Sequence, residues 1–156
     1  MKNTTCCFTG HRSIPASMLD TVKERLNASV TKLAEKGYTH FITGGALGFD
    51  TLAAQTVLYV KKSYPDITLH LVLPCPDQDK LWNGEQKRLY QEIIDNADSF
   101  EYVCDSYTKW CMAQRNRRMV ELSSVTVAYY DGKGKGGTAM TVGLAEKNGL
   151  EIINLF

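Results

Sequence analysis

The sequence lacks the features that mark several classes of protein. No apolar run approaches the roughly 20 residues of a membrane-spanning helix, so we expect no membrane association. Low-complexity segments, internal repeats and linkers are also absent. The start, Met1 to Thr5, has no signal-peptide pattern, and we therefore expect a cytoplasmic protein.

Excess charge of either sign is missing as well. Eighteen Lys and Arg residues against seventeen Asp and Glu residues give a formal net charge of +1. Such a surface has no overall field that would draw the protein onto nucleic acid or anionic lipid. We therefore expect any anion site to be local.

The cysteine pattern argues against a metal site. The five cysteines are an odd number, with no Cys-x-x-Cys spacing and no His at ligand spacing. Cys6 and Cys104 lie in apolar, strand-like runs and are expected to pack in the core. Cys75 and Cys111 lie nearer the candidate site, but packing is favoured over a nucleophilic role because no His and Asp can be placed beside them.

What the chain does contain is a regular alternation of strand-like and helical patterns. Of its 156 residues, 44% are hydrophobic, which suits one compact domain over residues 1–156. The alternation predicts a Rossmann-like, three-layer α/β/α sandwich with a mainly parallel sheet. Strands are predicted near Thr4–Thr9, His40–Thr43, Ile67–Leu73, Ser99–Val103, Val125–Tyr130 and Glu151–Asn154, and helices near Met18–Lys36, Asp50–Tyr64, Asn83–Asn96, Tyr107–Leu122 and Thr138–Lys147.

Glycine-rich segments follow two of the predicted strands, at the edge where such folds bind ligands. Thr43–Gly48 either offers backbone amides to a phosphate or forms a tight turn with Asp50 as the helix N-cap. No acidic residue ends the next strand to hold a ribose, which disfavours a standard NAD dehydrogenase. Gly132–Thr138 is either a phosphate cradle or a solvated loop, and Gly137 occupies the place of a Walker lysine.

Single side chains at the same edge extend the candidate site. Arg115 interrupts an apolar helix stripe, so it should meet a carboxylate, a phosphate or backbone carbonyls, and we favour a ligand role. His11 and Arg12 suit anion contact or proton transfer. Gln78 and Trp82 offer an amide and a stacking face for a base, although a core position for Trp82 is an equal alternative.

Several of these motifs together resemble a known family. Five motifs carry the resemblance: Phe8-Thr9-Gly10-His11-Arg12, Ile42–Asp50, Gln78-x-x-x-Trp82, Arg115-Asn116-x-x-Met119-Val120, and Asp131-Gly132 leading to Gly136-Gly137-Thr138. Their order along the chain is typical of a YpsA-type member of the SLOG superfamily. The resemblance covers nearly the whole chain. It implies a Rossmann-like fold, a sensing or regulatory role, a nucleotide, ADP-ribose-like or NAD-like ligand, and a homodimer.

The ligand-binding residues that we predict combine these motifs with the loops. They are Thr9, Gly10, His11, Arg12, Gly44, Gly45, Ala46, Gly48, Asp50, Gln78, Trp82, Arg115, Asn116, Asp131, Gly132, Gly136, Gly137 and Thr138.

Two better-understood relatives supply alternative functions. LONELY GUY phosphoribohydrolases cleave an N-glycosidic bond with the help of a Glu, whose place is taken here by Thr141. That activity would need Asp50 or Asp131 as the carboxylate. DNA-processing protein A binds single-stranded DNA, and a local patch with Lys133 and Lys135 keeps nucleic acid as a less favoured partner.

Overall fold

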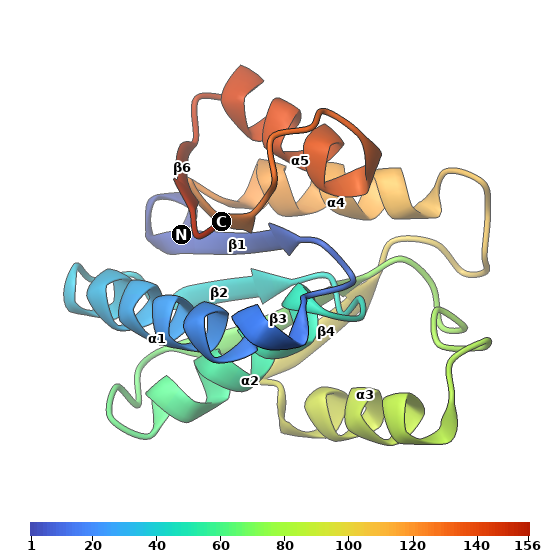
Figure 1. The fold of residues 1–156 in the computed structure, drawn as a ribbon, viewed down its shortest axis with the longest axis horizontal. Helices are drawn as coiled ribbons and strands as arrows, with labels where there is room; N and C mark the ends of the chain where they lie inside the picture. The colour runs from blue at the N-terminus through green and yellow to red at the C-terminus, as the bar shows by residue number, and fades with distance from the viewer.

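The computed structural model describes all 156 residues as a three-layer α/β sandwich (Figure 1). Its strands are β1 (Thr5–Gly10), β2 (His40–Thr43), β3 (Thr68–Leu73), β4 (Ser99–Tyr102), β5 (Val125–Tyr129) and β6 (Glu151–Asn154). Its α-helices are α1 (Leu19–Glu35), α2 (Phe49–Lys61), α3 (Gly84–Asn96), α4 (Cys111–Leu122) and α5 (Gly136–Lys147). The predicted fold class is therefore confirmed.

The strands form one parallel sheet in the order β4-β3-β2-β1-β5-β6. Helices α1, α2 and α3 cover one face, and α4 and α5 cover the other (Figure 1). The chain reverses its direction of travel across the sheet between β1 and β5. Their carboxyl ends leave a crevice there, which is the usual ligand position in doubly wound folds.

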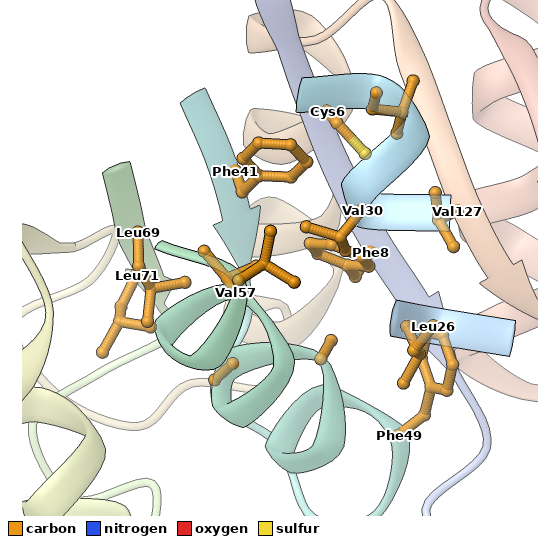
Figure 2. Close-up of a cluster of buried hydrophobic side chains, with 14 of the residues drawn as sticks. Cys6, Phe8, Leu26, Val30, Phe41, Phe49, Val57, Leu69, Leu71 and Val127 are labelled. Carbon is orange, nitrogen blue, oxygen red and sulfur yellow. The ribbon is translucent and has the colours of Figure 1, made fainter. Parts of the chain in front are cut away.

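The core follows the period-two alternation of the strands. Cys6 and Phe8 of β1 belong to a cluster of 22 buried residues under α1 and α2, whereas Cys7 packs with Met119 of α4 on the opposite face. Figure 2 shows the larger cluster, with Val57 of α2 reaching the strand side chains. Burial on both faces explains why β1 reads as an almost continuous apolar run.

Local residues determine several of the helix ends. Gly37 and Gly149 end α1 and α5 with φ values of 95° and 74°, as expected of left-handed C-caps. Helix α4 begins four residues later than predicted, at Cys111, because Thr108 forms a turn in which its carbonyl accepts the Cys111 amide. Cys104 was wrongly predicted to be a core residue: it follows β4, is partly exposed and donates to the side chain of Gln114.

No helix is both long and apolar enough to cross a membrane.

Candidate functional site

A cavity of about 430 Å³ lies at the carboxyl ends of β1 and β5 and is called the switch-point cavity below. Its size falls in the range of small-molecule sites. It is lined by Phe8, Thr9, Gly10, His11, Arg12, Ala46, Asp50, Met112, Arg115, Asn116, Met119, Lys135, Gly136, Gly137 and Thr138. Residues from β1, α2, α4 and α5, far apart in the sequence, therefore share one site.

Eleven of the eighteen predicted ligand-binding residues line this cavity, and seven do not. Those that line it are Thr9, Gly10, His11, Arg12, Ala46, Asp50, Arg115, Asn116, Gly136, Gly137 and Thr138. Those outside its lining are Gly44, Gly45, Gly48, Gln78, Trp82, Asp131 and Gly132. Four further residues line it without having been in the predicted set, namely Phe8, Met112, Met119 and Lys135, although Met119 shares the helix stripe of Arg115.

Arg115 is buried, with 5% of its surface exposed. Its Nη1 donates to the Gly44 carbonyl at 2.6 Å, and its Nε donates to Asn116 Oδ1 at 2.7 Å. Burial lowers the pKa of Arg115, and the charge of Asp50 opposes this effect. The sequence left a carboxylate, a phosphate or a backbone carbonyl as the partner of Arg115, and the structure shows a backbone carbonyl. Arg115 also lines the cavity.

Asp50 is a buried carboxyl group on the floor of the site, 6% exposed. It is not the helix N-cap considered from the sequence, because α2 begins at Phe49 with Gly48 at the N-cap, and Asp50 Oδ2 instead accepts the Ala46 amide at 3.1 Å. Burial raises the pKa of Asp50 to about 6, although Arg115, the Ala46 amide and Arg12 favour the charged form. Near neutral pH this carboxyl group can gain or lose a proton.

The loop of residues 44–48 uses most of its glycines for packing. A Cβ on Gly44 would lie 2.5 Å from Arg115 Nη1, and one on Gly48 would lie 2.2 Å from the Arg12 carbonyl. The Gly45 amide donates to Thr43 Oγ1, and the Ala46 amide is taken by Asp50. This loop therefore positions Arg115 and Asp50, and the one of its residues that lines the switch-point cavity, Ala46, has its amide already bonded.

The amino end of α5 differs from the loop of residues 44–48 because no side chain bonds to its first amides. Helix α5 begins at Gly136, with Lys135 at the N-cap position. Gly136, Gly137 and Thr138 line the cavity, so the positive end of a twelve-residue helix faces it. This geometry suits an anionic group.

His11 ties the exit of β1 to the loop that precedes α5. The Asp131 amide donates to His11 Nε2 at 3.1 Å, and Asp131 Oδ1 accepts the Lys133 amide at 3.0 Å. His11 Nε2 also lies 3.5 Å from Asp131 Oδ1. Asp131 thus orders the loop from outside the cavity lining.

Gln78 and Trp82 lie on the α3 side of the sheet. Gln78 Nε2 donates to the Tyr90 hydroxyl at 3.1 Å, and the Trp82 ring meets the Tyr90 ring edge-on at 5.0 Å. Trp82 lines a second cavity of about 570 Å³, called the Trp82 cavity below. Neither residue lines the switch-point cavity, although Gln78 Nε2 lies 3.5 Å from the Gly44 carbonyl that Arg115 also bonds.

Thr141 stands where a phosphoribohydrolase would carry its Glu. The side chain is fully buried, and Oγ1 donates to the Gly137 carbonyl one helical turn earlier, at 2.9 Å. It lines no part of the switch-point cavity. Asp50 is therefore the only carboxylate in the lining of that cavity, beside the cations Arg12, Arg115 and Lys135.

The parallel sheet and its switch point define a Rossmann-like protein, and a cavity lies at that switch point. Residues 6–152 match the model of the YpsA family, described as the "YspA SLOG family", and the chain belongs to this family. The resemblance noted from the sequence motifs is thus confirmed.

Relatives with similar sequences carry no assigned reaction in their names. The chain is 34% identical to the uncharacterized SPbeta prophage-derived protein YoqJ of Bacillus subtilis over an alignment of 139 residues, and the alignment covers 81% of this chain and 81% of the relative. It is 30% identical to a UPF0398 protein of Bacillus pumilus, covering 82% of this chain and 70% of the relative.

Two solved structures share the fold. One is DNA processing protein A from Helicobacter pylori, described for its single-stranded DNA binding mode, with a TM-score of 0.66 and 22% identity over 98% of this chain. Our chain spans 65% of that structure's chain. The other is the X-ray structure of TM1055, with a TM-score of 0.60 and 19% identity over 96% of this chain and 72% of that one.

Proposed function

We propose that the protein binds a nucleotide-type ligand in the switch-point cavity, with a phosphate at the amino end of α5, and serves as a sensing or regulatory domain. The observation that carries this proposal is the uncapped start of α5, whose backbone lines a cavity together with Arg12, Arg115 and Lys135. Three cations against the single carboxylate of Asp50 favour an anionic ligand. Membership of the SLOG family supports the same class of ligand.

Thermal-shift measurements with AMP, ADP, ADP-ribose, NAD and a cyclic nucleotide test the proposal. A ligand that binds only the folded state raises the melting temperature with its concentration. We expect at least one of these nucleotides to do so, and Arg12→Met to weaken its binding about tenfold by calorimetry, since a cation–phosphate contact is lost.

Arg117→Met is the matched control, because Arg117 is an exposed arginine on α4 that does not line this cavity. If no nucleotide shifts the melting temperature, or if both variants bind equally well, the proposal is wrong.

A second candidate is hydrolysis of a nucleotide N-glycosidic bond, with Asp50 as the catalytic carboxylate. The observation behind it is the position of Asp50 in the cavity with its pKa raised to about 6, which suits a group that exchanges a proton near neutral pH. Liquid chromatography should then detect free adenine released from AMP by the wild type and by Asp131→Asn. Asp50→Asn should release none, and activity retained in that variant would exclude this mechanism.

Single-stranded DNA is the alternative ligand suggested by the DNA processing protein A likeness. The exposed Lys133 and Lys135 flank the cavity and would contact the phosphate backbone. A gel shift with a single-stranded oligonucleotide would then weaken steeply as salt rises. Nucleotide binding without any such shift would favour the small-molecule ligand.

A further inference from the structure

The Trp82 cavity lies at the same edge of the sheet as the switch-point cavity and is lined by residues of α1, α2 and α3. Seven hydrophobic residues line it, among them Leu47, Leu52, Trp82 and Tyr90. Its volume of about 570 Å³ is also that of a small-molecule site. The lining of this cavity is therefore more hydrophobic than that of the switch-point cavity, which is rich in cations and free amides.

One loop lines both cavities. Ala46 and Asp50 border the switch-point cavity, and the intervening Leu47 and Gly48 border the Trp82 cavity. Arg12 lines both. The Phe49 amide donates to the His11 carbonyl at 3.2 Å, so the backbone after β1 contacts the backbone at the end of this loop. This contact separates the two cavities. They meet beside it, at Arg12.

The polar groups of the Trp82 cavity suit the edge of a planar ring. Gln86 Oε1 accepts the Asn83 amide at 3.0 Å, which leaves its Nε2 free to donate. Gln55 contributes a second, exposed amide group to the lining. A heteroaromatic base has two apolar faces and a hydrogen-bonding edge, and it fits between an aromatic pair and such amides.

We propose that the two cavities hold the two ends of one nucleotide, with its base in the Trp82 cavity, its phosphates in the switch-point cavity and Arg12 over the link. This inference rests on the proposed function and assigns the base its place. Because the backbone contact between His11 and Phe49 stands between the cavities, the ligand must pass it beside Arg12, and this reach favours a nucleoside 5′-diphosphate over a monophosphate.

The fluorescence of Trp82 tests whether the base occupies the Trp82 cavity. The chain has two tryptophans, and the other, Trp110, is 63% exposed and lines neither cavity. In the Trp110→Phe variant, ADP should bind at least tenfold more tightly than ribose 5-phosphate and change the Trp82 fluorescence. Ribose 5-phosphate should bind in calorimetry without that change, and AMP should bind more weakly than ADP.

Two outcomes overturn the inference in distinguishable ways. If ADP binds in calorimetry and the Trp82 fluorescence stays constant, the base lies elsewhere and the proposed function survives. If none of the three probes binds in calorimetry, the proposed function fails, and the inference fails with it.

A blocking substitution tests the same point without removing core contacts. Gln55→Trp fills the Trp82 cavity from an exposed position and should weaken ADP binding tenfold or more while leaving ribose 5-phosphate binding unchanged. Lys87→Trp is the control, because Lys87 is exposed on α3 and lines neither cavity. Equal ADP affinity of Gln55→Trp and the wild type would contradict the inference.

Discussion

The two loops at the carboxyl edge are both rich in glycine but differ in what surrounds their glycines. In the first loop, a Cβ on Gly44, Gly45 or Gly48 would lie 2.2–2.6 Å from the nearest atom of Arg115, Leu73 or Arg12. In the second loop, Gly132, Gly134 and Gly136 have positive φ and no atom within 4 Å of such a Cβ. The first loop therefore needs glycine for close packing, and the second needs it for its backbone path alone.

This difference assigns the two loops separate tasks. The first loop orients the buried Arg115 and Asp50 through the Gly44 carbonyl and the Ala46 amide. The second loop leads into the uncapped amides of α5, which stay open to the cavity. A substitution in the first loop should thus affect stability, whereas one in the second should affect ligand binding.

The largest effect is expected for Gly48→Ala. Gly48 has φ 76° and ψ −119°, a conformation that is almost restricted to glycine, and the added Cβ would overlap the Arg12 carbonyl. We expect a loss of roughly 3 kcal/mol or more in the free energy of unfolding, measured by urea denaturation. Gly134→Ala, with φ 73° and open space, should lose only about 1–2 kcal/mol. Equal losses would remove the contrast between the loops.

Arg115→Met tests the link between the first loop and α4. The substitution removes the donor to the Gly44 carbonyl and leaves the buried Asp50 without its nearby cation. Urea denaturation should show a loss of about 3 kcal/mol. Arg117→Met, at an exposed position two residues away, should stay within about 0.5 kcal/mol of the wild type. A small loss in Arg115→Met would mean that the arginine is held for the ligand alone.

The pH dependence of stability sharpens the assignment of Asp50. Its pKa of about 6 in the folded protein lies above the roughly 3.9 of an unfolded chain. Between these pH values the folded state holds the proton of Asp50 and the unfolded state does not. The contribution of this proton to the free energy of unfolding is therefore complete below about pH 4 and is lost as pH rises through 6. It amounts to at most roughly 3 kcal/mol.

The measurement is the difference in unfolding free energy between the wild type and Asp50→Asn from pH 4 to pH 7. This difference separates Asp50 from Asp98 and Glu101, whose lowered pKa values act in the opposite direction. The wild type should lose stability relative to the variant as pH rises. A constant difference would show that the pKa of Asp50 is not raised.

The smallest effect is expected in the second loop. Lys135→Met removes an exposed cation from the cavity lining and should leave the free energy of unfolding within about 0.5 kcal/mol of the wild type. Binding of ADP should weaken about fivefold in calorimetry, and less at high salt, where the charge is screened. Lys133→Met, outside the lining, is the control, and an equal weakening in both variants would indicate a general charge effect.

Much of the fold was predictable because it follows from local patterns. Alternation between strand-like runs and helical stripes predicted six strands and five helices, and Gly37 and Gly149 marked two helix ends. The motifs around Gly10, Gly44 and Gly137 identified the family. Arg115 was singled out because a charged side chain interrupted an apolar stripe.

The different roles of the two glycine-rich loops are decided by tertiary contacts. The sequence placed both loops at one edge, but their glycines have the same chemistry, and nothing local shows which amides are already bonded. That choice depends on Arg115, 71 residues away, reaching the Gly44 carbonyl. Likewise, Trp82 lies at a second cavity and not at the switch-point cavity, because β-strand order and crossover direction place α3 beside α2 and away from α4 and α5.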